Sequence, residues 1–240
     1  MKRLLIDAGN TRIKYALVEG ERWLPVLNLP GSAELRFDDP CYNGVEQVWV
    51  SNVAGAESGR QIAAACAARH WQPHIIVSQL AQCGVANGYA LAAQLGSDRW
   101  AALIAAWHQA GRACLVVNSG TATTIDALSG RGEFLGGLIL PGIELMQRSL
   151  TVATAGLQTV GERHADFPCN TADALFSGAI QASCGAIQRQ YALLDDVTAP
   201  VLLGGGAAGL LQPYLPLPVQ MMDNPVLQGL LLIAQDTNKA

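Results

Sequence analysis

Short apolar runs separated by polar turn residues predict a chain of alternating strands and helices. Near the start, residues 4–7 and 13–17 predict two strands around a Gly9-Asn10-Thr11 turn, and residues 45–50 predict a third strand. A helix is expected over residues 59–70 and a further strand over 75–77. This order is typical of an α/β protein.

An apolar stripe at helical spacing follows. It consists of Trp100, Leu103, Ile104 and Trp107, at positions i, i+3, i+4 and i+7. The helix is expected to begin near Ser97 and Asp98, because both residue types are favoured at a helix start. We interpret the stripe as core or interface packing.

The strand–turn–strand pattern then begins again. Residues 114–117 and 123–128 predict two strands around a Ser119-Gly120-Thr121 turn. A long helix is expected from residue 171 to about 194, with Asn170 as its N-cap. A last strand over 201–203 runs into three consecutive glycines.

The two strand–turn–strand units resemble each other. Asp7 and Asn118 each follow an apolar strand and precede a small residue, a glycine and a threonine, and they lie 111 residues apart. Similarity over such a distance indicates an internal repeat of domain length. We therefore predict two similar α/β lobes, over residues 1–112 and 113–240.

Composition narrows the class of protein. The 240 residues carry a net charge of −4 with a pI near 5.5, which argues against a nucleic-acid-binding protein. Only 14% of the residues are charged, against roughly 25% in an average soluble domain. We therefore expect part of the surface to be hidden in a subunit interface.

Two further patterns bear on location. The apolar runs are too short to span a membrane, and the first of them ends at Asp7, too early for a signal peptide. The six cysteines are scattered without a C-x-x-C pair, so we expect them to be reduced and buried. Both patterns favour a cytoplasmic protein.

The first turn, Asp7-x-Gly9-Asn10-Thr11-x-x-Lys14, has the groups that a phosphate site needs. A glycine lets backbone N–H groups approach anionic oxygens, and the Asn and Thr side chains add donors. Asp7 at the strand end suits Mg²⁺ held through water. The alternative interpretation is an ordinary Gly-Asn hairpin turn.

The second turn is rich in small hydroxyl residues between Asn118 and Thr124. Two such turns at matching places suggest a clamp, in which each lobe holds part of a polyphosphate in the cleft between them. The chain contains neither a Walker A sequence nor G-x-G-x-x-G, so P-loop and dinucleotide-binding folds lose support.

Several spaced motifs together resemble the type III pantothenate kinases, in order and over nearly the whole chain. They are Asp7-x-Gly9-Asn10-Thr11, Tyr89 followed by Leu95-Gly96-Ser97-Asp98-Arg99-Trp100, Gly120-Thr121-Ala122-x-Thr124-x-Asp126, Gly136-Gly137-x-Ile139-x-Pro141-Gly142, Ser149-Leu150, and Asn170-Thr171-x-x-Ala174-x-x-Ser177-Gly178.

The resemblance implies two RNase H-like lobes of the actin-like superfamily with a nucleotide cleft between them. It implies ATP-dependent phosphorylation of pantothenate to 4'-phosphopantothenate, the first step of coenzyme A biosynthesis, in a homodimeric cytoplasmic enzyme. By this resemblance, ATP is bound by Asp7, Gly9, Asn10, Thr11, Lys14, Gly120, Thr121 and Gly205, and pantothenate by Tyr89, Gly96, Ser97, Asp98, Arg99 and Thr171.

Asp98 matches the family's general base. Phosphoryl transfer needs a carboxylate that orients the attacking hydroxyl and accepts its proton. Arg99 beside it is suited to bind a carboxylate or a phosphate with two hydrogen bonds. The alternatives are a plain helix N-cap for Asp98 and a solvated helix charge for Arg99.

The chain departs from the family at Asn118, where the family usually has an aspartate that supports a monovalent cation, K⁺ or NH₄⁺. Asparagine keeps a carbonyl oxygen but lacks the negative charge that attracts a cation. The departure weakens the expectation of a K⁺ requirement. It also leaves room for an alternative function, a nucleotide-binding regulatory accessory protein of the same fold without turnover.

Overall fold

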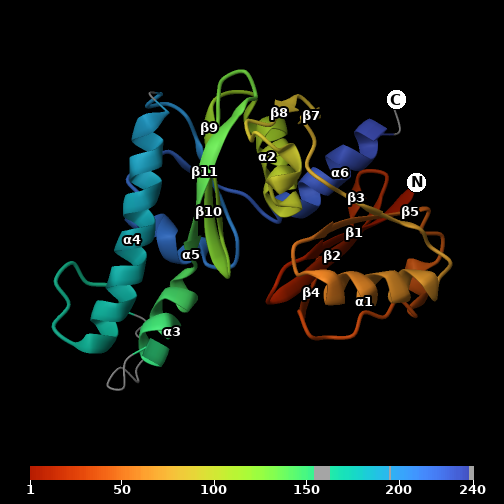
Figure 1. Ribbon diagram of the computed structural model, residues 1–240, viewed down its shortest axis with the longest axis horizontal. Coiled ribbons are helices and arrows are strands. Elements are labelled where there is room, and N and C mark those ends of the chain that lie inside the picture. Colours follow the sequence, from red (N-terminus) through yellow and green to blue (C-terminus); the bar gives the residue numbers. More distant parts are fainter. Residues whose placement is uncertain (154–162, 195, 238–240) are drawn as a thin grey trace. The chain divides into compact units, whose positions relative to one another are not determined.

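The computed structural model describes residues 1–153, 163–194 and 196–237. They fall into two compact units: residues 1–105 with 225–237, and residues 106–224 apart from the omitted ones. Each unit holds one main sheet flanked by helices (Figure 1). The division into two lobes over residues 1–112 and 113–240 stays a prediction.

The first unit is built on a mixed sheet in the order β3-β2-β1-β5-β6, with β4 also paired to β2. β1 and β2 are antiparallel, whereas β5 and β6 continue the sheet in parallel with β1. The strands are β1 (Lys2–Ala8), β2 (Arg12–Glu19), β3 (Arg22–Trp23), β4 (Leu27–Pro30), β5 (Gln47–Asn52) and β6 (Pro73–Ile75).

Helices cover both faces of this sheet. On one face α1 (Ala56–Ala67) buries Ile62 and Cys66 in the same hydrophobic core as Leu4 and Ile6 of β1. α6 (Pro225–Thr237) returns from the chain's end to pack on β1 and β5, and a Cβ at Gly229 would lie 1.9 Å from the Ala101 carbonyl oxygen of α2 (Ser97–Ala110). A small hairpin, β7 (Ala81–Gln82) and β8 (Val85–Ala86), precedes α2.

The second unit repeats the strand arrangement of the first. Its sheet order is β11-β10-β9-β12-β13, with β9–β11 antiparallel and β12 and β13 parallel to β9. The strands are β9 (Cys114–Ser119), β10 (Ala122–Leu128), β11 (Phe134–Pro141), β12 (Val201–Gly204) and β13 (Val219–Met221). This duplication confirms the two similar α/β halves that the paired turns predict.

One long helix covers the second sheet. α4 (Thr171–Leu193) buries an apolar stripe that includes Phe176, Ile180 and Ile187 against β9, β10 and β12 (Figure 1). The Asn170 side chain accepts a hydrogen bond from the Asp173 N–H, which confirms the predicted cap. α3 (Ile143–Ala153) and the short α5 (Ala208–Leu211) complete the unit.

Some expectations need correction. The helix expected at 59–70 begins at Ala56, and the strand expected at 75–77 lies at Pro73–Ile75. All six cysteines are free thiols, as expected, but Cys41 and Cys169 are exposed, so they are not core residues. Among the described residues, no helix combines the length and the hydropathy that a membrane span requires.

Candidate active site

The first candidate turn lies at the carboxyl end of β1. The Gly9 N–H donates to the Arg12 carbonyl oxygen over 3.0 Å and closes the turn, which leaves Asn10 and Thr11 exposed. Gly31, directly after β4, packs against the turn from outside: its N–H donates to the Thr11 carbonyl oxygen over 2.8 Å, and a Cβ would lie 2.9 Å from the Asn10 carbonyl oxygen. The turn is therefore held by backbone contacts.

Asp7 and Lys14 lie side by side on neighbouring strands. In the sheet register Asp7 is opposite Lys14 on β2 and opposite Ser51 on β5. Side chains at paired positions point to the same face of a sheet. A carboxylate and an ammonium group therefore flank the end of β1 next to the turn.

The environment of Asp7 disfavours its ionised form. Burial and then the nearby Asp98 carboxylate raise the pKa of Asp7 from 3.8 to about 7, and Lys14 opposes them. A carboxylate whose ionised form is disfavoured in this way readily binds a proton or a cation.

This pKa predicts the pH dependence of stability. Between pH 3.8 and about 7 the folded chain holds a proton on Asp7 that the unfolded chain has lost, so the free energy of unfolding falls as pH rises through this range. Asp7→Asn mimics the protonated side chain. We expect its melting temperature to exceed that of the wild type at pH 8, and the difference to shrink at pH 5. Thermal melts of both proteins without ligand test this; equal differences at the two pH values would contradict it.

Asp98 lies in the first turn of α2, which begins at Ser97. One carboxylate oxygen accepts the Arg99 N–H over 2.8 Å, so Asp98 bonds within the first turn rather than acting as the N-cap. A Cβ at Gly96 would lie 2.6 Å from this oxygen, so a larger residue there would displace the carboxylate. Burial raises the pKa of Asp98, although the N–H and the charge of Arg99 oppose it.

Arg99 is 6% exposed, so the interpretation as a solvated helix charge is wrong. Its guanidinium donates to the Tyr89 hydroxyl over 3.1 Å and lies 5.8 Å from the centre of the Tyr89 ring. The Asn87 side chain shapes the loop that carries Tyr89, because it accepts the Tyr89 N–H and donates to the Ala92 carbonyl oxygen. Tyr89, Asp98 and Arg99 therefore belong to one connected group in the first unit.

The second candidate turn, between β9 and β10, lies at the corresponding place in its unit but closes one residue earlier than the first. The Gly120 N–H donates to the Ala122 carbonyl oxygen, and the Gly142 N–H donates to the Thr121 carbonyl oxygen, both over 2.9 Å. A Cβ at Gly142 would lie 2.0 Å from the Gly120 carbonyl oxygen. Gly142 thus braces this turn as Gly31 braces the first, only more tightly.

Gly205 approaches the same turn from β12. Its φ is +96°, and a Cβ would lie 2.2 Å from the Ser119 carbonyl oxygen and 2.7 Å from Oδ1 of Asn118. The Ala207 N–H also donates to the Ser119 carbonyl oxygen over 3.0 Å. The structure therefore brings Asn118, Gly120, Thr121 and Gly205 together in the second unit.

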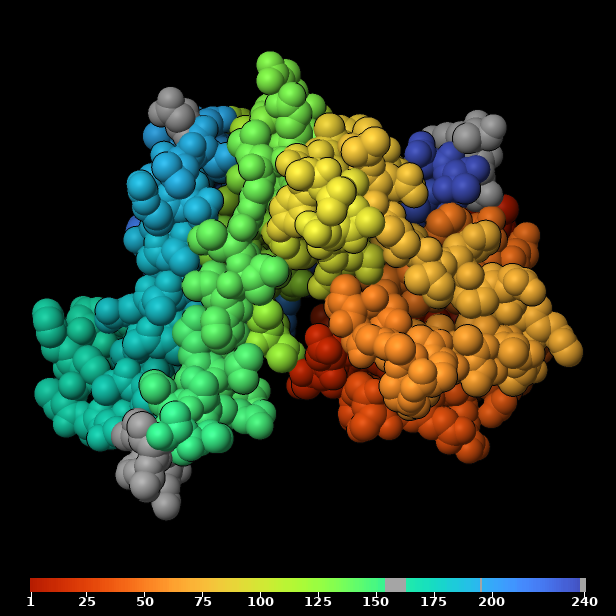
Figure 2. Space-filling view, in the orientation of Figure 1, coloured from red at the N-terminus to blue at the C-terminus, as the bar shows by residue number. Residues whose placement is uncertain are grey.

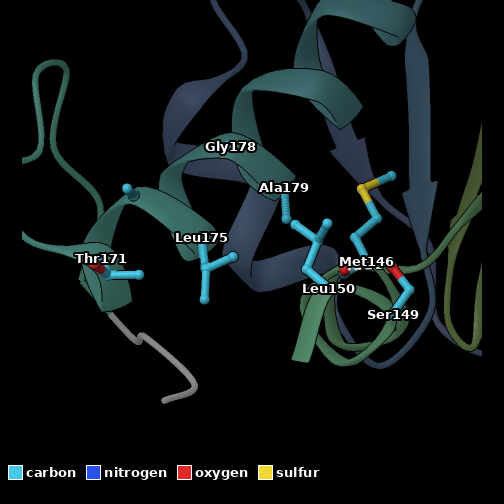
Figure 3. A pocket seen from close by; sticks show the side chains of 8 residues that line it. Met146, Ser149, Leu150, Thr171, Leu175, Gly178 and Ala179 are labelled. Carbon is cyan, nitrogen blue, oxygen red and sulfur yellow. Dashed lines mark hydrogen bonds between the residues drawn. The ribbon is translucent and has the colours of Figure 1, made fainter. Parts of the chain in front are cut away.

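Thr171 lies elsewhere in the second unit. It is the first residue of α4, and it lines a mainly apolar groove of about 470 Å³ between α3 and α4 (Figure 3). Met146 and Leu150 of α3 face Leu175 and Ala179 of α4 across the groove. α3 and the first turns of α4 are open to solvent in the space-filling view (Figure 2).

Sequence reasoning missed the two bracing glycines as a pair. Both follow a proline at the end of the strand that pairs with the second strand of the unit: Pro30 pairs with Arg12, and Pro141 with Ala122. The recurrence of Pro-Gly at these places was visible in the sequence as a second element of the internal repeat. The contact between Ser51 and Ser97 was also missed, because 46 residues separate the two serines in the chain.

The donor set fits Mg²⁺ held mainly by ligand and water oxygens. Within the described residues no three His, Cys, Asp or Glu side chains gather in a metal-binding group, which speaks against an all-protein metal cage there. Asp7 nevertheless places a carboxylate at the end of β1, beside a turn with exposed polar side chains. Mg²⁺ is commonly bound by one or two carboxylates plus phosphate oxygens.

Comparison with known proteins decides the family. The family model described as type III pantothenate kinase matches residues 3–193. The chain belongs to the type III pantothenate kinase family. A type III pantothenate kinase of Nitrosospira multiformis is 46% identical over 98% of this chain and 92% of its own length, and one of Aromatoleum aromaticum is 44% identical over 97% and 98%.

Solved structures support the fold of this pantothenate kinase family member. A Baf family protein of Campylobacter jejuni matches 99% of this chain and all of its own with a TM-score of 0.62 at 21% identity. The activator of 2-hydroxyisocaproyl-CoA dehydratase from Clostridium difficile matches 100% of this chain and 95% of its own, with a TM-score of 0.51 at 10% identity. The expected actin-like fold is confirmed.

Proposed function

We propose that this chain transfers the γ-phosphoryl group of ATP to the primary hydroxyl of pantothenate, with Asp98 as general base. Family membership supports the reaction, the first step of coenzyme A biosynthesis. The observation that carries the role of Asp98 is its position: a buried carboxylate in the first turn of α2, beside Asp7 and Arg99.

The base has two tasks. Asp98 accepts the proton of the attacking hydroxyl and orients one of that oxygen's lone pairs toward phosphorus. The raised pKa of Asp98 brings its basicity closer to the operating pH. Arg99 and Tyr89 position the substrate, for which a buried guanidinium is suited because it binds a carboxylate with two parallel hydrogen bonds.

The two turns hold the nucleotide in this proposal. Their short polar side chains face phosphate oxygens, and Lys14 supplies a positive charge. Mg²⁺, when bound, neutralises charge that develops on the phosphate oxygens. The nucleotide residues are Asp7, which acts on Mg²⁺ through water, and Gly9, Asn10, Thr11, Lys14, Gly120, Thr121 and Gly205; the pantothenate residues are Tyr89, Gly96, Ser97, Asp98, Arg99 and Thr171.

Two wider features belong to the same proposal. The enzyme is a cytoplasmic homodimer, which the low charge of the chain supports. The chain divides into two lobes, over residues 1–112 and 113–240, and each lobe supplies one nucleotide-binding turn. Sedimentation as a monomer at micromolar concentration would contradict the dimer.

A coupled assay of ADP release, with and without pantothenate, tests the reaction. Release that depends on pantothenate, together with phosphopantothenate detected by mass spectrometry, is expected. MgATP binding without such release, with and without K⁺, would favour the regulatory accessory protein instead.

The dependence of turnover on K⁺ tests the effect of Asn118, which stands where the family usually has an aspartate. Its Oδ1 and the Ser119 carbonyl oxygen both approach the space beside Gly205, so neutral oxygens are present for an alkali cation, but a charged one is missing. We expect replacing K⁺ by Na⁺ to change the wild-type kcat only slightly, and Asn118→Asp to make turnover clearly dependent on K⁺ or NH₄⁺. Titration of both proteins with KCl at constant ionic strength checks this. Strong K⁺ dependence of the wild type would contradict it.

A further inference from the structure

Two buried serine hydroxyls join the sheet of the first unit to the start of α2. Ser51 is 0% exposed and lies on β5, and Ser97 is 9% exposed and is the first residue of α2. Their Oγ atoms are 2.9 Å apart, at hydrogen-bond distance, although 46 residues separate them in the sequence. A hydroxyl pair inside a protein is held firmly, because separating it leaves two buried polar groups unpaired.

The pair lies next to the proposed chemistry. Ser51 is the register partner of Asp7, so both side chains project from the same face of the sheet. Ser97 is the covalent neighbour of Asp98. A connection therefore runs from the end of β1 through Ser51 and Ser97 to Asp98.

A third buried serine holds the segment before α2 but not α2 itself. Ser78 anchors the preceding segment, because its hydroxyl donates to the Leu95 carbonyl oxygen over 2.7 Å, but this bond ends before Gly96. The Ser51–Ser97 bond acts on the helix itself, one residue from the carboxylate.

We propose that Ser51 is a positioning residue, which through Ser97 holds the Asp98 carboxylate in place beside the end of β1. This inference rests on the proposed role of Asp98 as base. Misplacement of a reacting group by about 1 Å can cost about a hundredfold in rate, so a smaller shift of the helix start costs less but remains measurable.

The test compares steady-state kinetics and MgATP binding of single and double variants. We expect Ser51→Ala to lower kcat by about tenfold, with the dissociation constant of MgATP within about twofold of the wild type. Ser51→Ala/Ser97→Ala should have the kcat of Ser97→Ala alone, because adding the Ser51 change breaks no connection that the Ser97 change has left. The double variant also leaves neither hydroxyl buried without its partner, so it stays informative if the single variant folds poorly. Ser97→Thr, which keeps the hydroxyl, should retain more of kcat than Ser97→Ala.

Ser58→Ala is the matched control. The Ser58 hydroxyl is also buried in the first unit, on α1, and among the described residues it has no hydrogen-bond partner. Its removal should leave kcat unchanged. Equal kcat values for Ser51→Ala and Ser58→Ala, or losses at Ser51 and Ser97 that add up, would overturn the inference. Unchanged turnover of Asp98→Asn would instead remove the base role itself, so the two failures are distinguishable.

Discussion

Asp98→Asn lowers kcat by about two to four orders of magnitude, the usual contribution of a general base. Asparagine has the size of aspartate and still offers an oxygen to the Arg99 N–H, so the first turn of α2 is kept. It cannot accept the proton of the attacking hydroxyl. Pre-steady-state measurement of phosphopantothenate formation gives the rate of the chemical step directly.

The same substitution should leave nucleotide binding and folding intact. The wild-type carboxylate is buried beside Asp7, and both pKa values are raised, so removing one charge relieves repulsion. We expect the melting temperature of Asp98→Asn to equal or exceed that of the wild type at pH 8, and MgATP to bind at least as well. Calorimetric titration and thermal melts check these expectations.

Glu57→Gln is a suitable control for Asp98→Asn. Glu57 is also an acidic residue in the first turn of a helix, but it is exposed and paired with Arg60 on α1. Exposed pairs contribute little to stability, so this variant should keep normal turnover. Near-normal turnover of Asp98→Asn would show that another group accepts the proton.

Gly142→Ala should cause a large loss of stability in the second unit. The new Cβ would lie 2.0 Å from the Gly120 carbonyl oxygen and 2.8 Å from that of Thr121. Both oxygens belong to the backbone, so they cannot rotate away as a side chain does, and the whole turn has to move. We expect the free energy of unfolding to fall by about 3 kcal/mol, as in severe overpacking.

The displaced turn should also bind nucleotide less well. We expect the dissociation constant of MgATP to rise by about tenfold or more, since each misplaced hydrogen bond costs about 1 kcal/mol or more. Gly31→Ala, whose Cβ would lie 2.9 Å from the Asn10 carbonyl oxygen, should have the same effects more weakly. Urea denaturation and calorimetric titration measure both quantities.

Gly185→Ala is the control, because no other described group lies close to the place where its new Cβ would be. It lies in the exposed part of α4, and within the described structure a Cβ there would point into open space. Alanine should stabilise this helix by about 0.5–1 kcal/mol. A loss of less than 1 kcal/mol for Gly142→Ala, with unchanged MgATP affinity, would contradict the bracing role.

The sequence was most informative where local pattern alone decides structure. The caps and periodicity of α2 and α4 predicted these helices closely, because a helix satisfies its own backbone within a few residues. β11 and α3 were missing from the prediction. In β11 two glycines interrupt the run and Leu135 and Ile139 are exposed, so the alternation that marks a half-buried strand is lost.

Motifs and spacing were sufficient to predict the family, the duplicated α/β architecture and the proximity of Asp98 and Arg99 in one helix turn, because these depend on neighbours in the chain. Only the tertiary structure decided what lies around them: that Arg99 is buried against Tyr89, that α6 returns to β1, and that Ser51 meets Ser97. Strand register and helix packing join residues more than 40 positions apart. Such pairings follow from the packing of the whole unit, whereas a local pattern describes only one of the two elements that meet.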